Sequence, residues 1–163
     1  MAKKRGVFIV FEGIDGSGKS THIRFLRQEL QRRGFDALST AEPTRTGIGR
    51  LIRESVKAAS SQMSPEVEAL LFAADRVNHV KQVIEPALAA GRVVVSDRYV
   101  YSSLAYQVER GLDFEWVRLI NKFAPKADLC MYLDISPEVG IRRMRRRKKS
   151  VFEVLSLQQR IRE

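Results

Sequence analysis

Short apolar runs alternate with longer amphipathic segments along this chain. Four runs predict strands: Val7–Phe11, Asp36–Ala41, Arg92–Ser96 and Leu129–Ile135. The segments between them predict helices: Lys19–Arg33, Gly47–Ala59, a long helix from Pro65 to Ala90 with a bend at Pro86, Ser102–Glu109, Phe114–Phe123, and one opened by Ser136-Pro137-Glu138. The first run is apolar throughout, as expected of a strand that is buried on both faces.

Strands that alternate with helices predict an α/β fold, in which a parallel sheet lies between two layers of helices. Ligands bind at the carboxyl ends of the strands in such sheets. The 163 residues suit one domain, and no repeat or linker interrupts them.

Composition narrows the class of protein further. The chain is 44% hydrophobic and 29% charged, and no apolar run approaches the ~18 residues needed to cross a bilayer. We therefore expect a soluble protein without a membrane segment. The only cysteine, Cys130, cannot form an intrachain disulfide, which fits a reducing cytoplasm. The net charge of +10 is compatible with binding either nucleic acid or polyphosphates.

A glycine-rich loop follows the first predicted strand and opens the first predicted helix. It matches the pattern G-x-x-x-x-G-K-[ST] of phosphate-binding loops with the residues Gly13, Ile14, Asp15, Gly16, Ser17, Gly18, Lys19 and Ser20, followed by Thr21. Backbone N–H groups and the helix start would bind phosphate oxygens. Lys19 would reach the β- and γ-phosphates, and Ser20 would ligate Mg²⁺. The loop indicates a nucleotide but leaves the reaction open.

Five segments together resemble the thymidylate kinase family, in its order along the chain. They are Phe11–Thr21, Glu42-Pro43-Thr44-Arg45 with Gly47 and Gly49, Leu71-Phe72 with Arg76, Asp97-Arg98-Tyr99 with Ser102, Ser103, Tyr106 and Gln107, and Leu133–Glu138 leading into an Arg-rich stretch. The resemblance covers essentially the whole chain and implies a P-loop kinase fold.

The resemblance also implies an acceptor site for thymidylate (dTMP). Its base would stack on Phe72 and meet Arg76, with Ser103 and Gln107 near the pyrimidine edge. Asp15 would accept a hydrogen bond from the sugar 3′-hydroxyl, and Tyr106 would crowd the 2′ position. Arg45 and Arg98 would bind the acceptor phosphate, for which the planar guanidinium is well suited. Without the resemblance, a core aromatic is the favoured explanation of Phe72, and Arg76 reads as a solvated helix charge. For Arg45 and Arg98 a surface charge or a structural ion pair is the alternative.

Catalytic roles follow from the same resemblance. Asp97 would hold a Mg²⁺-bound water beside Lys19 and Arg98, although an ion pair with Arg98 explains it as well. The basic cluster from Arg142 to Lys149 matches the family's lid, at about residues 140–153. Family members with glycine at the position of Gly16 supply a lid arginine to the transferring phosphate; Arg143, Arg146 and Arg147 are the candidates here. A basic patch for nucleic acid remains the alternative for this cluster.

The family pattern continues beyond Glu163 through another helix, a last strand and a final helix. We therefore expect residues 1–163 to form a single P-loop kinase domain that lacks its C-terminal strand and part of the adenine pocket.

The predicted activity is transfer of the γ-phosphate of ATP to dTMP, with Mg²⁺ as cofactor, in a cytoplasmic homodimer. Apolar positions around Ala69, Leu70, Ala73 and Val77 could form the dimer contact or belong to the core. A deoxynucleoside kinase and a basic P-loop ATPase that binds nucleic acid or a protein are the alternatives. Membrane association is not expected, and nucleic acid is the less favoured partner.

Overall fold

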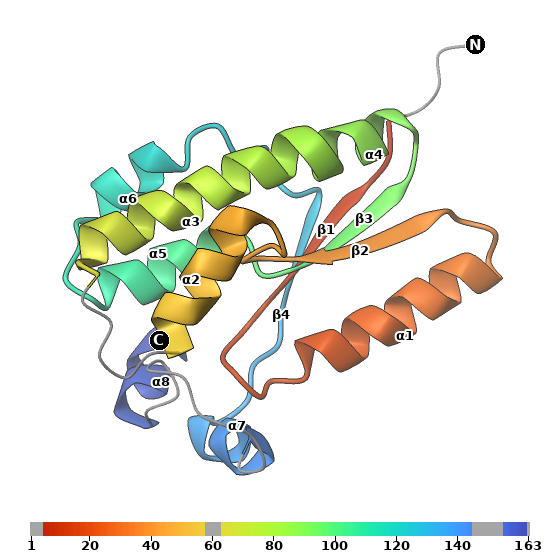
Figure 1. Ribbon diagram of the computed structural model, residues 1–163. Helices are drawn as coiled ribbons and strands as arrows, with labels where there is room; N and C mark the ends of the chain where they lie inside the picture. Colours follow the sequence, from red (N-terminus) through yellow and green to blue (C-terminus); the bar gives the residue numbers. More distant parts are fainter. Residues whose placement is uncertain (1–4, 58–62, 145–154, 163) are drawn as a thin grey trace.

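The sheet is parallel and has helices on both faces (Figure 1). The computed structural model describes residues 5–57, 63–144 and 155–162. Four strands occur in this part of the chain, in the order β2-β3-β1-β4. They are β1 (Phe8–Glu12), β2 (Ala37–Ala41), β3 (Val93–Asp97) and β4 (Leu129–Tyr132). The predicted α/β class and parallel sheet are confirmed.

The described helices follow the predicted segments closely. They are α1 (Lys19–Arg32), α2 (Gly47–Lys57), α3 (Pro65–His79), the π-helical turn η1 (Val80–Ile84), α4 (Glu85–Ala89), α5 (Val100–Val108), α6 (Phe114–Ile120), α7 (Pro137–Met144) and α8 (Leu155–Arg162). Among them, none is long and apolar enough to cross a membrane.

The long helix predicted between Pro65 and Ala90 is continuous, with α3, η1 and α4 running into one another (Figure 1). Ser64 caps its start, because its side chain accepts a hydrogen bond from the backbone N–H of Val67 at 3.4 Å. The irregularity falls just before Pro86 as a widened π-helical turn. Proline has no N–H for the carbonyl four residues earlier, which explains why regular α-helix stops there.

Alternate residues of β1 build two separate cores. Phe8 and Val10 pack with Val94 and Ile84 on the side covered by η1 and α4. Ile9 and Phe11 pack on the opposite side, in the cluster that contains Ile23 of α1. Because both faces of β1 are covered, the strand is apolar at every position up to Glu12.

The two outer strands of the described sheet differ in burial: β2 is mostly buried or half-buried, and β4 is exposed. All four residues of β4 are exposed, and within the described residues β4 pairs with β1 alone. The carboxyl ends of β1 and β3 lie side by side, since Phe11 is the partner of Asp97 in the ladder. This edge of the sheet carries the glycine-rich loop and the Asp97-Arg98 pair.

Candidate active site

The glycine-rich loop joins β1 to α1 and holds the lysine in a defined place. Gly13, Gly16 and Gly18 have φ values of 137°, 78° and 98°, a region that favours glycine. The Lys19 ammonium donates to the carbonyl of Gly13 at 2.8 Å and to that of Ile14 at 3.0 Å. Burial, with a smaller contribution from the nearby guanidinium, lowers the pKa of Lys19 to about 8.

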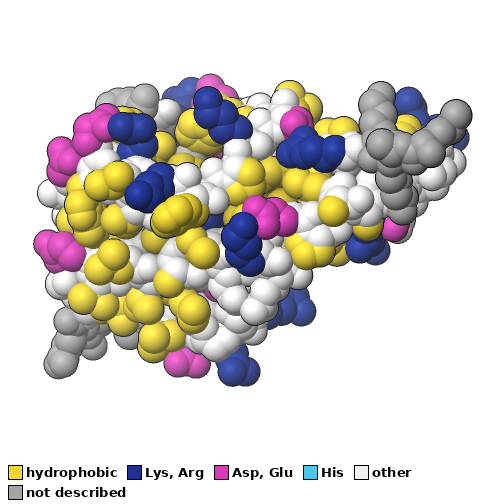
Figure 2. All heavy atoms as spheres, turned by 90° about the horizontal axis from the view of Figure 1, so that it is seen from above, with side chains coloured by type: hydrophobic (Ala, Val, Ile, Leu, Met, Phe, Trp, Pro, Cys, Tyr) yellow, Lys and Arg dark blue, Asp and Glu magenta, His cyan; other side chains and the backbone are white. Residues whose placement is uncertain are grey.

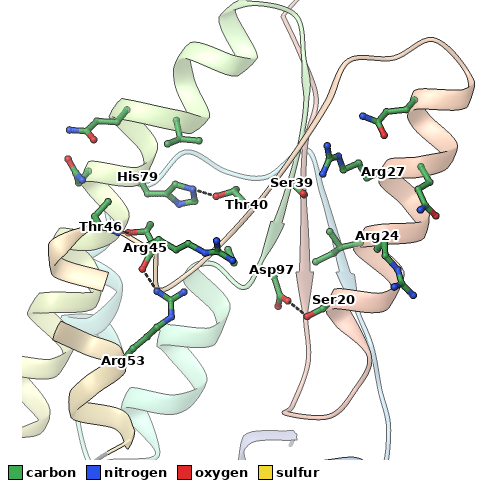
Figure 3. A pocket seen from close by; sticks show the side chains of 18 residues that line it. Ser20, Arg24, Arg27, Ser39, Thr40, Arg45, Thr46, Arg53, His79 and Asp97 are labelled. Atoms are coloured by element: carbon green, nitrogen blue, oxygen red, sulfur yellow. Dashed lines mark hydrogen bonds between the residues drawn. The ribbon is translucent and has the colours of Figure 1, made fainter. Parts of the chain in front are cut away.

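Asp97 ends β3 and meets the start of α1. The Ser20 hydroxyl donates to Asp97 Oδ2 at 2.9 Å, a contact that Figure 3 shows across the carboxyl edge of the sheet. A hydroxyl and a carboxylate oxygen thus lie together beside the loop. Oxygen ligands of this kind, completed by phosphate oxygens and water, are what Mg²⁺ prefers.

Arg98 has an unusual backbone conformation, with φ 72°. Its guanidinium donates to Ser102 Oγ at 2.9 Å, Asp15 Oδ1 at 2.7 Å and the Tyr106 hydroxyl at 3.1 Å. A positive φ is a sparsely populated conformation for a non-glycine residue, and it occurs preferentially at functional sites. These contacts fix the guanidinium opposite the glycine-rich loop.

The loop, Asp97 and Arg98 line one cavity of about 850 Å³, to which Arg53 and Arg143 also contribute. Lys19 and the guanidinium of Arg98 supply positive charge to it, while Asp15 and Asp97 supply carboxylates. The loop from Asp15 to Thr21 and Arg98 are therefore brought together around one space that is large enough for phosphate groups.

Comparison with known proteins decides the family. The family profile described as thymidylate kinase matches residues 11–163. A probable thymidylate kinase of Pyrococcus abyssi is 53% identical over 164 residues, which cover 97% of this chain and 80% of the relative. A thymidylate kinase of Akkermansia muciniphila is 45% identical over 153 residues, covering 93% of this chain and 73% of that protein.

The chain belongs to the thymidylate kinase family. The resemblance seen in the five sequence segments is therefore confirmed. Family membership does not test the roles of individual residues, so those roles stay predictions.

Arg76, predicted to meet the base of the acceptor, is the centre of a buried polar network. Its Nε donates to Glu42 Oε2 at 2.8 Å, and its Nη2 donates to Tyr99 O at 3.1 Å and Ser103 Oγ at 3.0 Å. Its Nη1 donates to the Asn121 side-chain oxygen. Only 2% of Arg76 is exposed. The residue thus joins β2, α3, α5 and α6, and any contact with a base would be made from within this network.

The other predicted base-binding residues lie close to this network. Ser103 and Gln107 are buried on α5, and Phe72 is partly buried on α3, one turn before Arg76. Gln107 Oε1 is buried and has no hydrogen-bond partner among the described residues. A buried acceptor without a partner is costly, so this amide is available to a ligand.

Arg45 takes a different direction from the other predicted phosphate ligands. Asp75 of α3 anchors the loop on both sides of it, accepting from the Thr44 backbone N–H at 2.7 Å and from the Thr46 hydroxyl at 3.1 Å. The Arg45 side chain is exposed and lines a second groove rather than the loop cavity. The structure therefore does not bring Arg45 together with Arg98 in one cavity.

Arg53 of α2 lines both spaces and was missed by sequence reasoning. Its guanidinium donates to the carbonyls of Pro43 and Thr44, which fixes it against the loop after β2. Arg50 and Lys57 lie on the same helix, and helix arginines are usually solvated, so the sequence did not single out Arg53 as a site residue.

Two further positions were missed because their partners are distant in sequence. Glu12, 4% exposed, accepts from the backbone N–H groups of Tyr99 and Ser102 at 2.9 and 3.2 Å, and from the Ser102 hydroxyl at 2.6 Å. It ties β1 to the start of α5. Gln158 of α8 is fully buried and accepts from the backbone N–H of Asp15 at 3.0 Å. For Glu12 the only sequence signal was its place as a carboxylate at the end of an apolar strand, and for Gln158 there was none.

Of the three predicted lid arginines, Arg143 is the one that the structure describes. It donates to the carbonyl of Gly16 at 3.2 Å, so α7 is in contact with the glycine-rich loop. Arg146 and Arg147, with most of the predicted lid at 140–153, lie outside the described residues.

Proposed function

We propose that this chain transfers the γ-phosphate of ATP to dTMP, giving ADP and dTDP. The observation that carries the proposal is the shared cavity. Lys19 of the glycine-rich loop and Arg98 at the end of β3 line the same space at the carboxyl edge of the sheet. A phosphate donor bound to the loop and a phosphorylated acceptor bound to the arginine would meet there. The proposal also draws on the names of the relatives.

The loop residues Gly13–Thr21 bind the donor phosphates in this proposal. Their backbone N–H groups and the start of α1 provide a positive potential for the anion. The Lys19 ammonium moves from the loop carbonyls to the donor's β- and γ-oxygens when ATP enters. A polyphosphate beside the ammonium favours its charged form and so keeps it protonated.

We propose that Ser20 and Asp97 hold Mg²⁺ together with phosphate oxygens and water. The two side chains fit this ion, because they present adjacent oxygens and Mg²⁺ sites in kinases often use only one or two protein ligands. No group of three or more His, Cys, Asp or Glu side chains that could hold a metal occurs among the described residues. The ion would neutralise charge on the transferring phosphoryl group.

Arg98 binds the acceptor phosphate, and Arg53 faces the same cavity as a second cation. In this proposal Asp15, which pairs with Arg98, accepts a hydrogen bond from the acceptor's 3′-hydroxyl, and Tyr106, whose hydroxyl contacts the same guanidinium, crowds the 2′ position. Arg45 completes this set when its exposed side chain turns from the neighbouring groove toward the acceptor phosphate. Phe72, Arg76, Ser103 and Gln107 bind the base.

Catalysis in this arrangement comes from position and charge. The attacking oxygen is already an anionic phosphate oxygen, so no strong base is required. Holding donor and acceptor in line removes much of the entropic cost of the encounter. Lys19, Arg98 and Arg143 then stabilise the charge on the equatorial oxygens, with Arg146 and Arg147 as further candidates.

We propose a homodimer that forms through the side bearing α3 and α6. Figure 2 looks down on the α3–α4 side and shows hydrophobic side chains gathered toward the end where α3 and α6 lie. Leu70 and Val67 of α3 are 49% and 48% exposed, and Leu119 of α6 is 58% exposed. Ala69 and Ala73, by contrast, are buried within their own chain.

Cys130 is the only cysteine, and its thiol has no partner for an intrachain disulfide. This composition suits a reducing compartment, and we propose the cytoplasm.

The test is release of ADP from ATP–Mg²⁺ with dTMP, dUMP, thymidine, AMP, CMP and no acceptor. Turnover with dTMP well above the others is expected, and the Lys19→Ala variant should be nearly inactive. Turnover with thymidine alone would make the protein a nucleoside kinase. Turnover that is independent of acceptor would make it an ATPase. Either outcome overturns the proposal, as does full activity of Lys19→Ala.

A further inference from the structure

A second groove adjoins the phosphate cavity and runs along the carboxyl end of β2. Its walls are α1 on one side and α3 with η1 on the other, and its volume is about 1030 Å³ (Figure 3). Ser20, Arg53 and Asp97 line both spaces, so the two are adjacent. Lys19 and Arg98 line only the phosphate cavity. The groove is therefore a separate place for a ligand.

Four arginines line this groove, two on each wall. Arg24 and Arg27 come from α1, and Arg45 and Arg53 come from the segment after β2. Figure 3 shows Arg27 and Arg45 extending into the groove from opposite sides. The only carboxylate among the described lining residues is Asp97, which already accepts from Ser20.

The arginines at the centre of the groove lack acidic partners. Arg27 and Arg45 form no ion pair with any residue that the structure describes. Arg32 and Arg33, farther along the same helix, both pair with Glu29 at 2.7 and 2.6 Å. Unpaired guanidinium groups facing one another repel, and a bound anion removes that repulsion. Guanidinium also binds phosphate oxygens in a two-pronged manner.

The other lining residues include four side-chain amides, which can form hydrogen bonds, and two apolar side chains. Gln28 and Gln31 of α1 and Asn78 and Gln82 of the opposite wall also line the groove, as do Ile23 and Val83. The volume matches that of small-molecule sites, which span roughly 300–1,000 Å³. Concentration of the charge in one groove of this size favours a small ligand over an extended nucleic acid.

We propose that this groove is a second polyphosphate-binding site, distinct from the glycine-rich loop. Its ligand carries at least two linked phosphates, which Arg27 and Arg45 bind from opposite walls, while Arg24 and Arg53 add positive charge at the rim. Free polyphosphate and a nucleotide share this chemistry. The proposal does not depend on the kinase activity, because binding to the groove requires neither an acceptor nor turnover.

The probe is sodium tripolyphosphate, titrated into the ¹⁵N-labelled full chain while the arginine Nε–H signals are followed by NMR. The signals of Arg24 and Arg27 should shift and saturate, whereas that of Arg32 should stay in place. The double variant Arg24→Gln/Arg27→Gln should weaken this binding about tenfold or more, as expected from the loss of charge-assisted hydrogen bonds. Glutamine is a good helix former, so α1 is retained.

Arg32→Gln is the matched control, because it removes one positive charge from the same helix outside the groove. It should change the affinity for tripolyphosphate less than about twofold, since an exposed, distant charge is screened. Equal weakening by the control and by Arg27→Gln would overturn the site and indicate a diffuse electrostatic effect. Shifts restricted to the glycine-rich loop, with the double variant unaffected, would overturn it too.

A second arm uses ATP without metal, and it distinguishes the two sources of the ligand. Tighter binding than tripolyphosphate, with added shifts of the side-chain amides of Asn78 and Gln82, would identify the ligand as a nucleotide. Shifts of the arginines alone, with equal affinity for both probes, would identify free polyphosphate. Binding of neither probe to the groove would overturn the proposal.

Discussion

Arg98 Nη2 lies 2.7 Å from Asp15 Oδ1, and this ion pair joins the end of β3 to the glycine-rich loop. Both side chains are partly exposed, at 17% and 23%, so they line the cavity and still reach the solvent. The pair keeps the guanidinium in position before any acceptor arrives. A phosphate that enters the cavity meets a cation whose conformational entropy has already been reduced, which favours productive binding.

The first prediction concerns Arg98→Ala. The variant should raise KM for dTMP and lower turnover, with a combined loss in kcat/KM of about 100-fold or more, because two charge-assisted hydrogen bonds disappear. The Kd for ATP should stay near normal. Steady-state kinetics and isothermal titration measure the two effects. Arg118→Ala, which removes an exposed arginine paired with Glu115, is the matched control. Equal loss of ATP and acceptor binding would contradict the assignment.

The second prediction concerns the contact between α7 and the glycine-rich loop. A Cβ atom on Gly140 would lie 2.5 Å from the carbonyl oxygen of Asp15, and one on Gly16 would lie 2.4 Å from that of Gly140. Gly140→Ala therefore forces α7 and the loop apart. We expect a loss of about 1–3 kcal/mol in stability, as for other overpacked sites, together with weaker ATP binding.

Gly47→Ala is the control for this substitution, because no atom lies within 4 Å of a Cβ built there. Its melting temperature and Kd for ATP should match the unmodified chain or improve slightly, since alanine favours helix over glycine. If Gly140→Ala behaves in the same way as Gly47→Ala, the contact has no role in holding the loop.

Local patterns were sufficient to predict the fold. Phe8–Phe11 of β1 and Val93–Val95 of β3 are continuous apolar runs because both faces of each strand are covered, and such runs are visible in the sequence. The proline after Ser64 identified the start of α3 correctly. Strand ends were less accurate: the fourth strand was expected to reach Ile135 but ends at Tyr132. Edge strands have fewer pairing constraints, so their ends are less well determined by pattern.

The site was predictable only where one segment carries the chemistry. Residues 13–20 form a contiguous motif, and in the structure Lys19 and Ser20 begin α1, where Ser20 contacts Asp97. Glu12 and Gln158 act through contacts with residues 87 and 143 positions away, which no local pattern encodes. The orientation of Arg45 depends on Asp75, 30 positions later in the chain, which anchors its loop from α3.

The third prediction concerns Arg76 as a structural centre. Arg76→Met leaves Glu42 buried without its guanidinium partner and should lower the free energy of unfolding by about 3–5 kcal/mol. Chemical denaturation measures this loss. The physical cause is the buried charge, so Arg76→Met/Glu42→Gln should recover part of it. A double variant that is less stable than Arg76→Met would contradict this explanation.

The last prediction concerns Asp128, which ties the segment before β4 to the start of β1. Its Oδ2 accepts from the backbone N–H of Phe8 at 2.7 Å, and its Oδ1 pairs with Arg5 at 2.9 Å. The hydrogen bond from Phe8 and, to a smaller extent, the Arg5 guanidinium hold the pKa of Asp128 below its ordinary value.

A carboxylate with a lowered pKa binds fewer protons in the folded chain than in the unfolded chain. Its contribution to stability is therefore present above the ordinary pKa of about 4 and is lost as the pH falls through the lower, folded value. Asp128→Asn should cost about 1 kcal/mol at pH 7, a modest figure because the side chain is 39% exposed.

Urea denaturation of Asp128→Asn and the unmodified chain should show this difference at pH 7 and a smaller difference at pH 3. Subtracting one curve from the other removes the contributions of the other carboxylates that titrate in both proteins. Asp36→Asn is the control, since the exposed Asp36 side chain forms a surface ion pair with Arg92 and its loss should change stability little at either pH. A difference for Asp128→Asn that stays constant between pH 7 and pH 3 would contradict this prediction, because it would show that the charge of Asp128 contributes nothing to the contact between β1 and the segment before β4.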